Sequence, residues 1–420
     1  MLKDRYDNAL TTTSQAARDG YVAATDLMLE GQAGIVDAFA AVTRHDPGFA
    51  LGWAGIARAH QVMGDMPAAA QALAKARSFA TGASAREISH IEALSRIFSG
   101  QPGAYSVICD HLDSYPRDAI LAQTCSSVFG LIGFSGQPGR EAEMLAFNAK
   151  LLPHYGEDWW AISQYAFALC ETGNLVQADR LIDKAMALNP RNAHGAHVRS
   201  HVSYELGDTQ AGLDYLSDWL GSYDRGGVMF THLNWHEALW ALAQGDVDRM
   251  WARVDAAVSP AAQSGGPAIN TLTDTVSILH RARLAGVDVE KERWQSVSAF
   301  AQAAFPQTGN AFIDVHAALA HAMAGREDAL MAILEHPAGP AADLVPDLGA
   351  GFQAISRDDW ETASDALMRA MADLARMGGS RAQRDMVEQT LLYALTKQGK
   401  AGEARDIAAL RRPILTAQGA

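Results

Sequence analysis

Two pairs of histidines are spaced so that each pair shares one face of a helix. His197 and His201 are four residues apart, and so are His232 and His236. Residues at i and i+4 of an α-helix lie one above the other, and two histidines placed in this way can hold one zinc ion. The pattern therefore makes His197, His201, His232 and His236 candidate zinc ligands, without assigning a cofactor to the protein. The order HExxH is absent, because Glu205 follows its two histidines instead of lying between them.

Further aromatic, acidic and histidine side chains occupy comparable positions in neighbouring segments. Besides binding zinc, histidines beside carboxylates can act as acids and bases without a metal, or they can stack on a ligand whose cationic groups pair with the carboxylates. The ligand-binding candidates are Trp160, His197, His201, Glu205, His232, Trp235, His236, Asp274, His280, Asp314 and His316. The catalytic candidates are His201, Glu205, His236, Asp314 and His316.

Each of these residues also has a simpler interpretation. A histidine in a groove is commonly a solvated surface residue, and Trp160 and Trp235 could fill gaps between repeats. No serine or cysteine nucleophile stands out, and Cys170 is expected to face the core. His45, His90, His111 and His336 are expected to lie at helix ends or on outer faces and are assigned no functional role.

The elements that must position the candidates are helix pairs of a repeat. Around Gly64, Trp53 and Ala57 precede the glycine and Ala69 and Leu73 follow it, in the order large, small, turn, small, large that is typical of a tetratricopeptide unit. Apolar positions recur every three or four residues, which favours helices over strands. Equivalent turn positions are Gly64, Gly100, Gly136, Gly173, Gly207, Gly245, Gly286, Gly325, Asp358 and Gly399.

These turns predict an all-α protein, an α-α superhelix that is a tetratricopeptide-like solenoid of about ten helix pairs. We expect one solenoid over residues 1–420: a capping helix in 1–34, first repeats in 35–154, central repeats rich in His and Trp in 155–325, and C-terminal repeats in 326–420. Residues 119–137 carry no charge and are expected to form a buried helix pair. The first helix of each pair should line a concave groove, with exposed positions about thirteen, ten, six and two residues before the turn glycine.

The composition of the chain limits which kinds of molecule it is expected to bind. The chain has 34 basic and 48 acidic residues and a net charge of −14, which disfavours binding to nucleic acid. The cysteines Cys109, Cys125 and Cys170 are odd in number and form no CxxC pair, as expected in a reducing compartment. The N-terminal residues do not resemble a signal peptide, and no segment is apolar enough to cross a membrane. We therefore expect a cytoplasmic protein. The sequence does not decide whether it forms a homo-oligomer.

Three segments resemble the tetratricopeptide repeat protein 38 family over most of the chain. They are the tract with His197, His201 and Glu205, the tract His232-Leu233-Asn234-Trp235-His236, and Phe312-Ile313-Asp314-Val315-His316. The second tract departs from the family at Thr231, where a glycine is common. The resemblance implies a tetratricopeptide-like superhelix and a functional site at these histidines, but no reaction or ligand.

Two functions are compatible with these observations. The first is a binding protein whose concave groove, lined by His, Trp, Asp and Glu, holds a small molecule or a peptide. The second is a hydrolase-type enzyme that uses the same cluster, with or without zinc. The sequence does not decide whether the chain is an enzyme.

Overall fold

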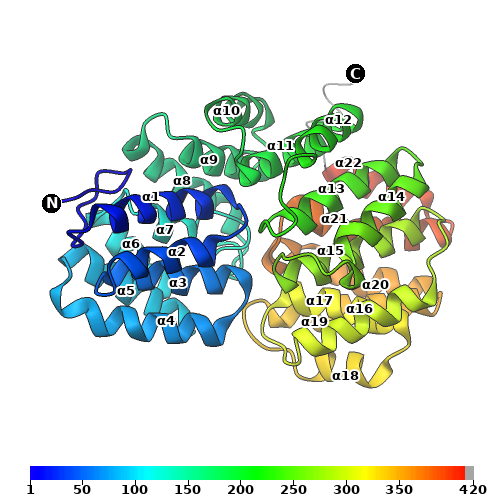
Figure 1. Ribbon diagram of the computed structural model, residues 1–420. Helices are drawn as coiled ribbons and strands as arrows, with labels where there is room; N and C mark the ends of the chain where they lie inside the picture. Colours follow the sequence, from blue (N-terminus) through cyan, green and yellow to red (C-terminus); the bar gives the residue numbers. More distant parts are fainter. Residues whose placement is uncertain (412–420) are drawn as a thin grey trace.

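The computed structural model describes residues 1–411, and these residues form an all-α superhelix of consecutive helix pairs (Figure 1). The last nine residues of the expected C-terminal repeats, 412–420, lie outside the described part. The only β-type pairing in the described residues is an isolated bridge between Lys3 and Ala9. The helices are α1 (Gln15–Glu30), α2 (Ile35–His45), α3 (Ala50–Met63), α4 (Met66–Phe79), α5 (Ala85–Phe98), α6 (Ala104–Ser114), α7 (Ala119–Gln123), α8 (Arg140–Tyr155), α9 (Trp159–Glu171), α10 (Leu175–Leu188), α11 (Ala193–Leu206), α12 (Thr209–Leu220), α13 (Phe230–Ala243), α14 (Val247–Arg253), α15 (Ala268–Leu284), α16 (Lys291–Ala304), α17 (Ala311–Ala324), α18 (Glu327–Glu335), α19 (Val345–Ser356), α20 (Trp360–Met371), α21 (Arg381–Lys397) and α22 (Ala401–Arg411).

All ten predicted turn positions lie between two consecutive helices, and nine of them lie in connections of six residues or fewer. Gly64 ends α3 with a left-handed backbone (φ 85°), and its neighbour Asp65 then caps α4 by accepting a hydrogen bond from Ala68 N. Glycine reaches positive φ without steric cost, so it ends a helix and lets the chain turn back at once. Asp358 fills the same position with φ 58°, although it is not a glycine. The repeat that the turns predict is therefore confirmed.

The exception is Gly136, and the buried helix pair expected over residues 119–137 is wrong. Only α7 is helical there, and the chain from 124 to 139 forms successive turns. Gly133 shows why: a Cβ at this position would lie 2.0 Å from the carbonyl oxygen of Val128, so the loop folds back on itself more tightly than a helix can. Gly136 packs against Ala341, where an added Cβ would lie 2.8 Å from the Ala341 nitrogen. Gly136 thus joins two distant parts of the chain.

The first helix of each central pair lies inside the superhelix. Nearly every residue of α9, α11, α13, α15 and α17 is buried, whereas their partners bury only one side; α10, for example, buries Ala178, Ile182 and Ala185. A helix buried all round must be apolar or must pair its polar groups internally. This placement explains why polar side chains on these inner helices contact one another instead of water.

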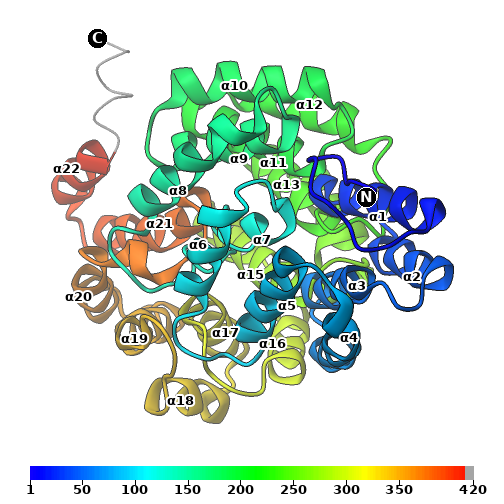
Figure 2. The ribbon, with the colours of Figure 1, turned by 90° about the vertical axis from the view of Figure 1, so that its left-hand side faces the viewer.

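The superhelix closes on itself. Seen from the side of the N-terminus, the chain runs round a ring in which α8 lies beside α21 (Figure 2). Arg140, at the start of α8, donates hydrogen bonds to the carbonyl oxygens of Gly133, Ala375 and Gly379 at 3.1, 2.5 and 2.5 Å. Val228 N donates to Gly31 O at 3.1 Å, which fastens the start of α13 to the end of α1. Helices from both halves of the chain therefore surround the concave side of the solenoid.

None of the helices described is both long and apolar enough to cross a lipid bilayer.

Candidate metal centre

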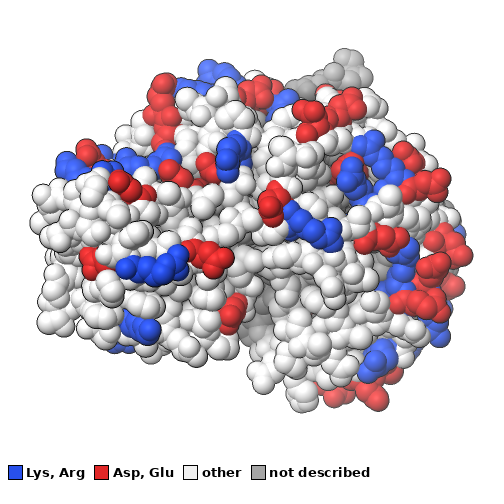
Figure 3. Space-filling view, viewed as in Figure 1, with Lys and Arg blue, Asp and Glu red and all other residues white. Residues whose placement is uncertain are grey.

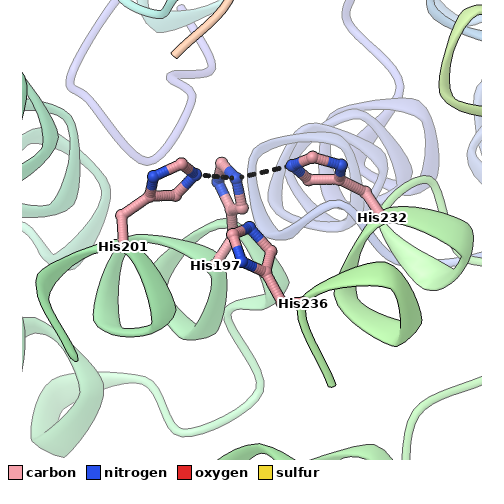
Figure 4. A group of neighbouring side chains, drawn as sticks. All are labelled: His197, His201, His232 and His236. Atoms are coloured by element: carbon pink, nitrogen blue, oxygen red, sulfur yellow. Dashed lines mark hydrogen bonds between the residues drawn. The ribbon is translucent and has the colours of Figure 1, made fainter. Parts of the chain in front are cut away.

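The four histidines that are candidate zinc ligands lie together, although they come from two helices. His197 and His201 project from α11, and His232 and His236 project from α13 (Figure 4). The donor nitrogens of all four lie within 4.8 Å of one another. His197 Nε2 lies 2.8 Å from His201 Nε2 and 3.1 Å from His232 Nε2. The i, i+4 spacing thus places two imidazoles on each of two facing helices.

All four side chains are buried, which corrects the expectation of an exposed groove surface. His201 and His236 have no exposed surface, and His232 and His197 are 4% and 7% exposed. Aromatic rings surround the cluster: Trp235 stacks on His232 with the ring centroids 5.0 Å apart, and Phe167 lies against His197 and His201. The cluster is therefore held in a dry, apolar setting.

One buried carboxylate orients an imidazole from behind. Asp274 on α15 has Oδ2 2.8 Å from Nδ1 of His232. A carboxylate at Nδ1 favours the tautomer with the proton on that nitrogen, which leaves a lone pair on Nε2. The lone pair of His232 Nε2 then points toward His197. Glu171, the last residue of α9, has Oε1 3.9 Å from Nδ1 of His201, which is too long for a hydrogen bond.

Burial keeps three of the four imidazoles neutral. It lowers the pKa of His197, His201 and His236 well below the ordinary value, and the neighbouring histidines lower these pKa values further. Burial also raises the pKa of the Asp274 carboxyl, and it raises the pKa of Glu171 to about 7. A neutral imidazole is the form that binds a metal ion. His197, His201 and His236 are therefore in the protonation state that metal binding requires at neutral pH.

Several polar atoms of the cluster have no hydrogen-bond partner among the described residues. They include both ring nitrogens of His236, together with Glu171 Oε1 and Asp274 Oδ1. A buried polar group without a partner ordinarily costs about 1–3 kcal/mol. Zinc binds imidazole nitrogen at about 2.0–2.1 Å, so tetrahedral ligands stand about 3.3 Å apart. The two Nε2 distances at His197 are shorter than this, and the four donor nitrogens together lie within 4.8 Å of one another, so the side chains would have to shift to hold an ion.

A cavity of about 420 Å³ adjoins the cluster, and His197 and His232 form part of its wall. Most of the remaining wall is apolar, with Phe129, Phe134 and Phe167 among the larger side chains. Figure 3 shows a cleft between the N-terminal helices and the helices from α15 onward, with charged side chains scattered around it. A cavity of this size accommodates an ordinary small molecule.

Two other candidates belong to this cluster, but not as the sequence suggested. Trp235 supports His232 and is buried, so it does not present a face to a ligand. Asp274 contacts His232 from behind and does not line the cavity. Both act on the cluster through His232.

The remaining candidates lie elsewhere. Trp160 packs on Tyr155 and does not line the cavity. Glu205 Oε2 lies 3.5 Å from Arg381 Nε and is not a member of the four-histidine group. Trp160 and Glu205 are therefore not members of the four-histidine cluster.

His280, His316 and Asp314 are also apart from the four histidines. His280 Nε2 pairs with Thr390 Oγ1 at 2.8 Å, and His316 Nδ1 donates to the Phe312 carbonyl at 2.6 Å. Asp314 accepts a hydrogen bond from Gly309 N at 3.1 Å, and burial raises its pKa to about 6. His280 therefore links α15 to α21, whereas the hydrogen bonds of His316 and Asp314 are local to α17 and the loop before it.

His90 and His111 lie in a second, buried polar cluster. The expectation that they lie at helix ends or on outer faces is therefore wrong. Both are buried around Asp118, whose Oδ2 is 2.9 Å from His90 Nδ1, 3.2 Å from His111 Nε2 and 2.9 Å from Arg86 Nη1. His111 Nδ1 also contacts Ser89 Oγ at 2.8 Å. This arrangement satisfies the Asp118 carboxylate with three partners, and none of its residues lines the cavity. It links α5, α6 and α7, and we assign it a structural role.

Sequence reasoning missed Glu171, Arg58 and His194. Glu171 stands two residues before Gly173, Arg58 six before Gly64, and His194 thirteen before Gly207, so all three occupy predicted groove positions. Arg58 and His194 line the cavity, and Glu171 contacts His201. A list of every residue at the groove positions of every repeat, whatever its type, would have included these three residues.

Comparison with known proteins adds no finer classification. No family model matches the sequence. The chain is similar to the structure of a human IFIT1 dimer with m7Gppp-AAAA, with 13% identity, coverage of 98% of this chain and 97% of that chain, and a TM-score of 0.47. It is also similar to yeast Tom70 (12% identity, 92% and 82% coverage, TM-score 0.36) and to the TPR domain of P58(IPK) (14% identity, 92% and 99% coverage, TM-score 0.21).

The fold defines the chain as a tetratricopeptide-like helical-repeat protein, on the evidence of its own helix pairs. The narrower resemblance to the tetratricopeptide repeat protein 38 family stays a prediction. The expectation that the chain binds no nucleic acid also stays a prediction.

Proposed function

We propose that this protein binds a transition-metal ion through His197, His201, His232 and His236, and that the cavity beside this ion holds a small molecule. The observation that carries the proposal is the convergence of four buried imidazoles whose donor nitrogens lie within 4.8 Å of one another. A cavity of about 420 Å³ is of the size that holds a small molecule.

A metal ion explains the geometry better than hydrogen bonds between the histidines. His197 Nε2 has two imidazole nitrogens within 3.1 Å, but a neutral ring nitrogen carries either one proton or one lone pair. It can satisfy both neighbours only by sharing a single proton, and His236 still has no partner. A cation between the lone pairs would satisfy all four rings. Imidazole ligands suit zinc, copper, nickel and iron, and we take zinc as the first ion to test.

Proton transfer without a metal fits the structure less well. A histidine that shuttles protons should titrate near the working pH. Burial lowers the pKa of His201 and His236 well below the ordinary value, so both rings stay neutral at pH 7. Among the catalytic candidates, His201 and His236 therefore act more naturally as metal ligands than as acids.

A hydrolase is the second candidate function, and the position of His197 and His232 in the cavity wall favours it. An ion held by these residues would have one side toward the cavity. A zinc-bound water has a pKa of about 7 and supplies hydroxide at neutral pH. This reaction requires a coordination position that protein ligands do not fill, because catalytic zinc sites keep one open.

Metal analysis of protein purified without a polyhistidine tag tests the proposal. We expect about one ion per chain by mass spectrometry of the metal content. His201→Asn and His236→Asn should lose the ion, because loss of one ligand weakens a zinc site severely. His280→Asn provides a matched control, since His280 is equally buried but lies outside the cluster. Wild-type protein that neither retains nor takes up zinc, copper, nickel or iron would refute the proposal.

Cobalt substitution separates the two functions. Cobalt(II) has visible absorption bands that report its coordination number, and azide is a small ligand that can occupy an open position. A change in the spectrum on addition of azide would indicate an open position and favour the hydrolase. An unchanged, tetrahedral spectrum would indicate four histidine ligands and a metal that does not meet the cavity ligand.

A further inference from the structure

Arg58 is a positively charged side chain in the cavity wall that has no carboxylate partner. It projects from α3, Nη1 donates to Gln61 Oε1 at 2.9 Å, and Nη2 donates to Gln123 Oε1 at 3.2 Å. Its Nε is buried and has no hydrogen-bond partner among the described residues. Both partners of the guanidinium are therefore neutral amides.

Two buried arginines of this protein are paired differently from Arg58, which is partly buried. Arg86 Nη1 lies 2.9 Å from Asp118 Oδ2, and Arg384 forms an ion pair with Glu141. Burial without a nearby acid lowers the pKa of Arg58 to about 10. An unpaired charge in a low-dielectric site is costly, because the solvation lost on burial is not replaced. Arg58 is thus a binding group whose counter-charge the protein does not supply.

The cavity as a whole is cationic and lacks acids. Among the described residues that line it there is no aspartate or glutamate, and Arg58 is the one lysine or arginine. This contrasts with the chain's net charge of −14. The other polar groups of the lining include the amides of Gln164, Asn270 and Gln383, which can donate hydrogen bonds to a ligand.

Apolar side chains line the cavity together with Arg58 and two of the four histidines. Val62, Ile97 and Leu131 line the cavity with Arg58, and Phe167 and Val198 line it with His197 and His232. His194 also lines the cavity and stands three residues before His197 on α11. A ligand that occupies this space needs an apolar body and a group that pairs with a guanidinium.

We infer that the cavity binds a small organic anion with an apolar body, and that Arg58 pairs with its anionic group. A carboxylate is the simplest such group, because the planar guanidinium matches it with two parallel hydrogen bonds. The inference names the class of ligand for the cavity of the proposed function and rests on that function. Arg58 is a specificity-determining residue in this role.

Binding of matched ten-carbon probes tests the inference. Decanoate and decan-1-ol have the same chain and differ at the charged end. We expect zinc-free wild-type protein to bind decanoate roughly 10–100-fold more tightly than decanol, as a charge-assisted bidentate pair predicts. Arg58→Gln should abolish this ratio, and Arg58→Lys should keep part of it. Arg77→Gln is the control, because Arg77 is exposed on the neighbouring α4 and does not line the cavity.

The outcomes distinguish this inference from the metal proposal. If decanoate is preferred only in zinc-loaded protein and equally in Arg58→Gln, the carboxylate binds the ion and the inference is wrong. If the preference depends on Arg58 but no metal binds, the inference stands and the metal proposal fails. Failure of wild-type protein to bind decanoate at about 1 mM, or equal binding of both probes, would also overturn the inference. Thermal unfolding of each variant verifies that it is folded.

Discussion

Replacing Asp274 by asparagine tests whether the four histidines form a metal centre. Asp274 Oδ2 lies 2.8 Å from His232 Nδ1. Asparagine has the same shape and keeps an oxygen at this place, but it removes the charge that makes a ligating imidazole more basic. Such carboxylate partners are typically worth about 10–100-fold in metal affinity. We expect Asp274→Asn to fold normally and to bind zinc more weakly by this factor.

The expected change in stability follows from mass action. When free zinc is about 100 times the dissociation constant of the wild type, binding adds about 2.7 kcal/mol to the free energy of unfolding. A variant with 10–100-fold weaker affinity meets the same zinc at about 10 to 1 times its own dissociation constant. Its stabilisation then falls to about 1.4–0.4 kcal/mol. Denaturant unfolding with and without buffered zinc measures this difference.

A matched control separates the metal effect from a general loss of charge. Asp347 is a carboxylate on α19 that pairs with Arg369 at 2.8 Å, far from any histidine of the cluster in the chain. Asp347→Asn should gain as much stability from zinc as the wild type. If Asp274→Asn also gains as much as the wild type, or if zinc stabilises none of the three proteins, the cluster is not a metal centre oriented by Asp274.

Three further predictions concern the fold. Ala178→Leu and Ala363→Leu should each lower the free energy of unfolding by about 1–3 kcal/mol, because both residues are fully buried where helices cross; Val176→Leu, at an exposed position of α10, should not change the denaturant midpoint. Arg140→Met should leave three carbonyl oxygens without their donor, lower stability by roughly 3–5 kcal/mol and increase the radius of gyration in small-angle scattering. Burial lowers the pKa of His280 from 6.5 to about 3, so below pH 6.5 the unfolded chain binds a proton that the folded chain does not. The wild type should therefore lose stability as the pH falls from 6.5 toward 3, by up to about 1.4 kcal/mol per pH unit from this residue, and His280→Gln should lose less between pH 7 and pH 5 in parallel unfolding curves.

The helix pairs could be predicted from the sequence because each turn is a local event. A glycine such as Gly64 needs only positive φ and the helices that flank it, and both are visible in the sequence. The closure of the superhelix could not be predicted in this way. It depends on Arg140 reaching Ala375 and Gly379, more than 230 residues away in the chain. Contacts of this range leave no periodic signal.

The histidine cluster was within reach of sequence reasoning, whereas its surroundings were not. His197 and His232 are 35 residues apart, which is about one tetratricopeptide repeat, so they occupy similar places on adjacent inner helices. The groove positions also include Arg58 and Glu171, which did not attract notice because neither forms a spaced pair with another candidate. Whether such a position faces water or a cavity depends on how tightly the solenoid coils, and single repeats do not encode that curvature.

The energetic cost of the cluster is the strongest argument that it has a purpose. Both nitrogens of His236 and the free oxygens of Glu171 and Asp274 are buried without hydrogen bonds among the described residues. At about 1–3 kcal/mol for each unsatisfied group, these atoms consume much of the roughly 5–15 kcal/mol by which a folded domain is stable. Apolar residues of similar volume would pack the same space at lower cost. The polar cluster around Asp118 shows that this fold can satisfy buried histidines completely. The ion that we propose would complete the interactions of these atoms, and metal analysis of the purified protein tests whether it does.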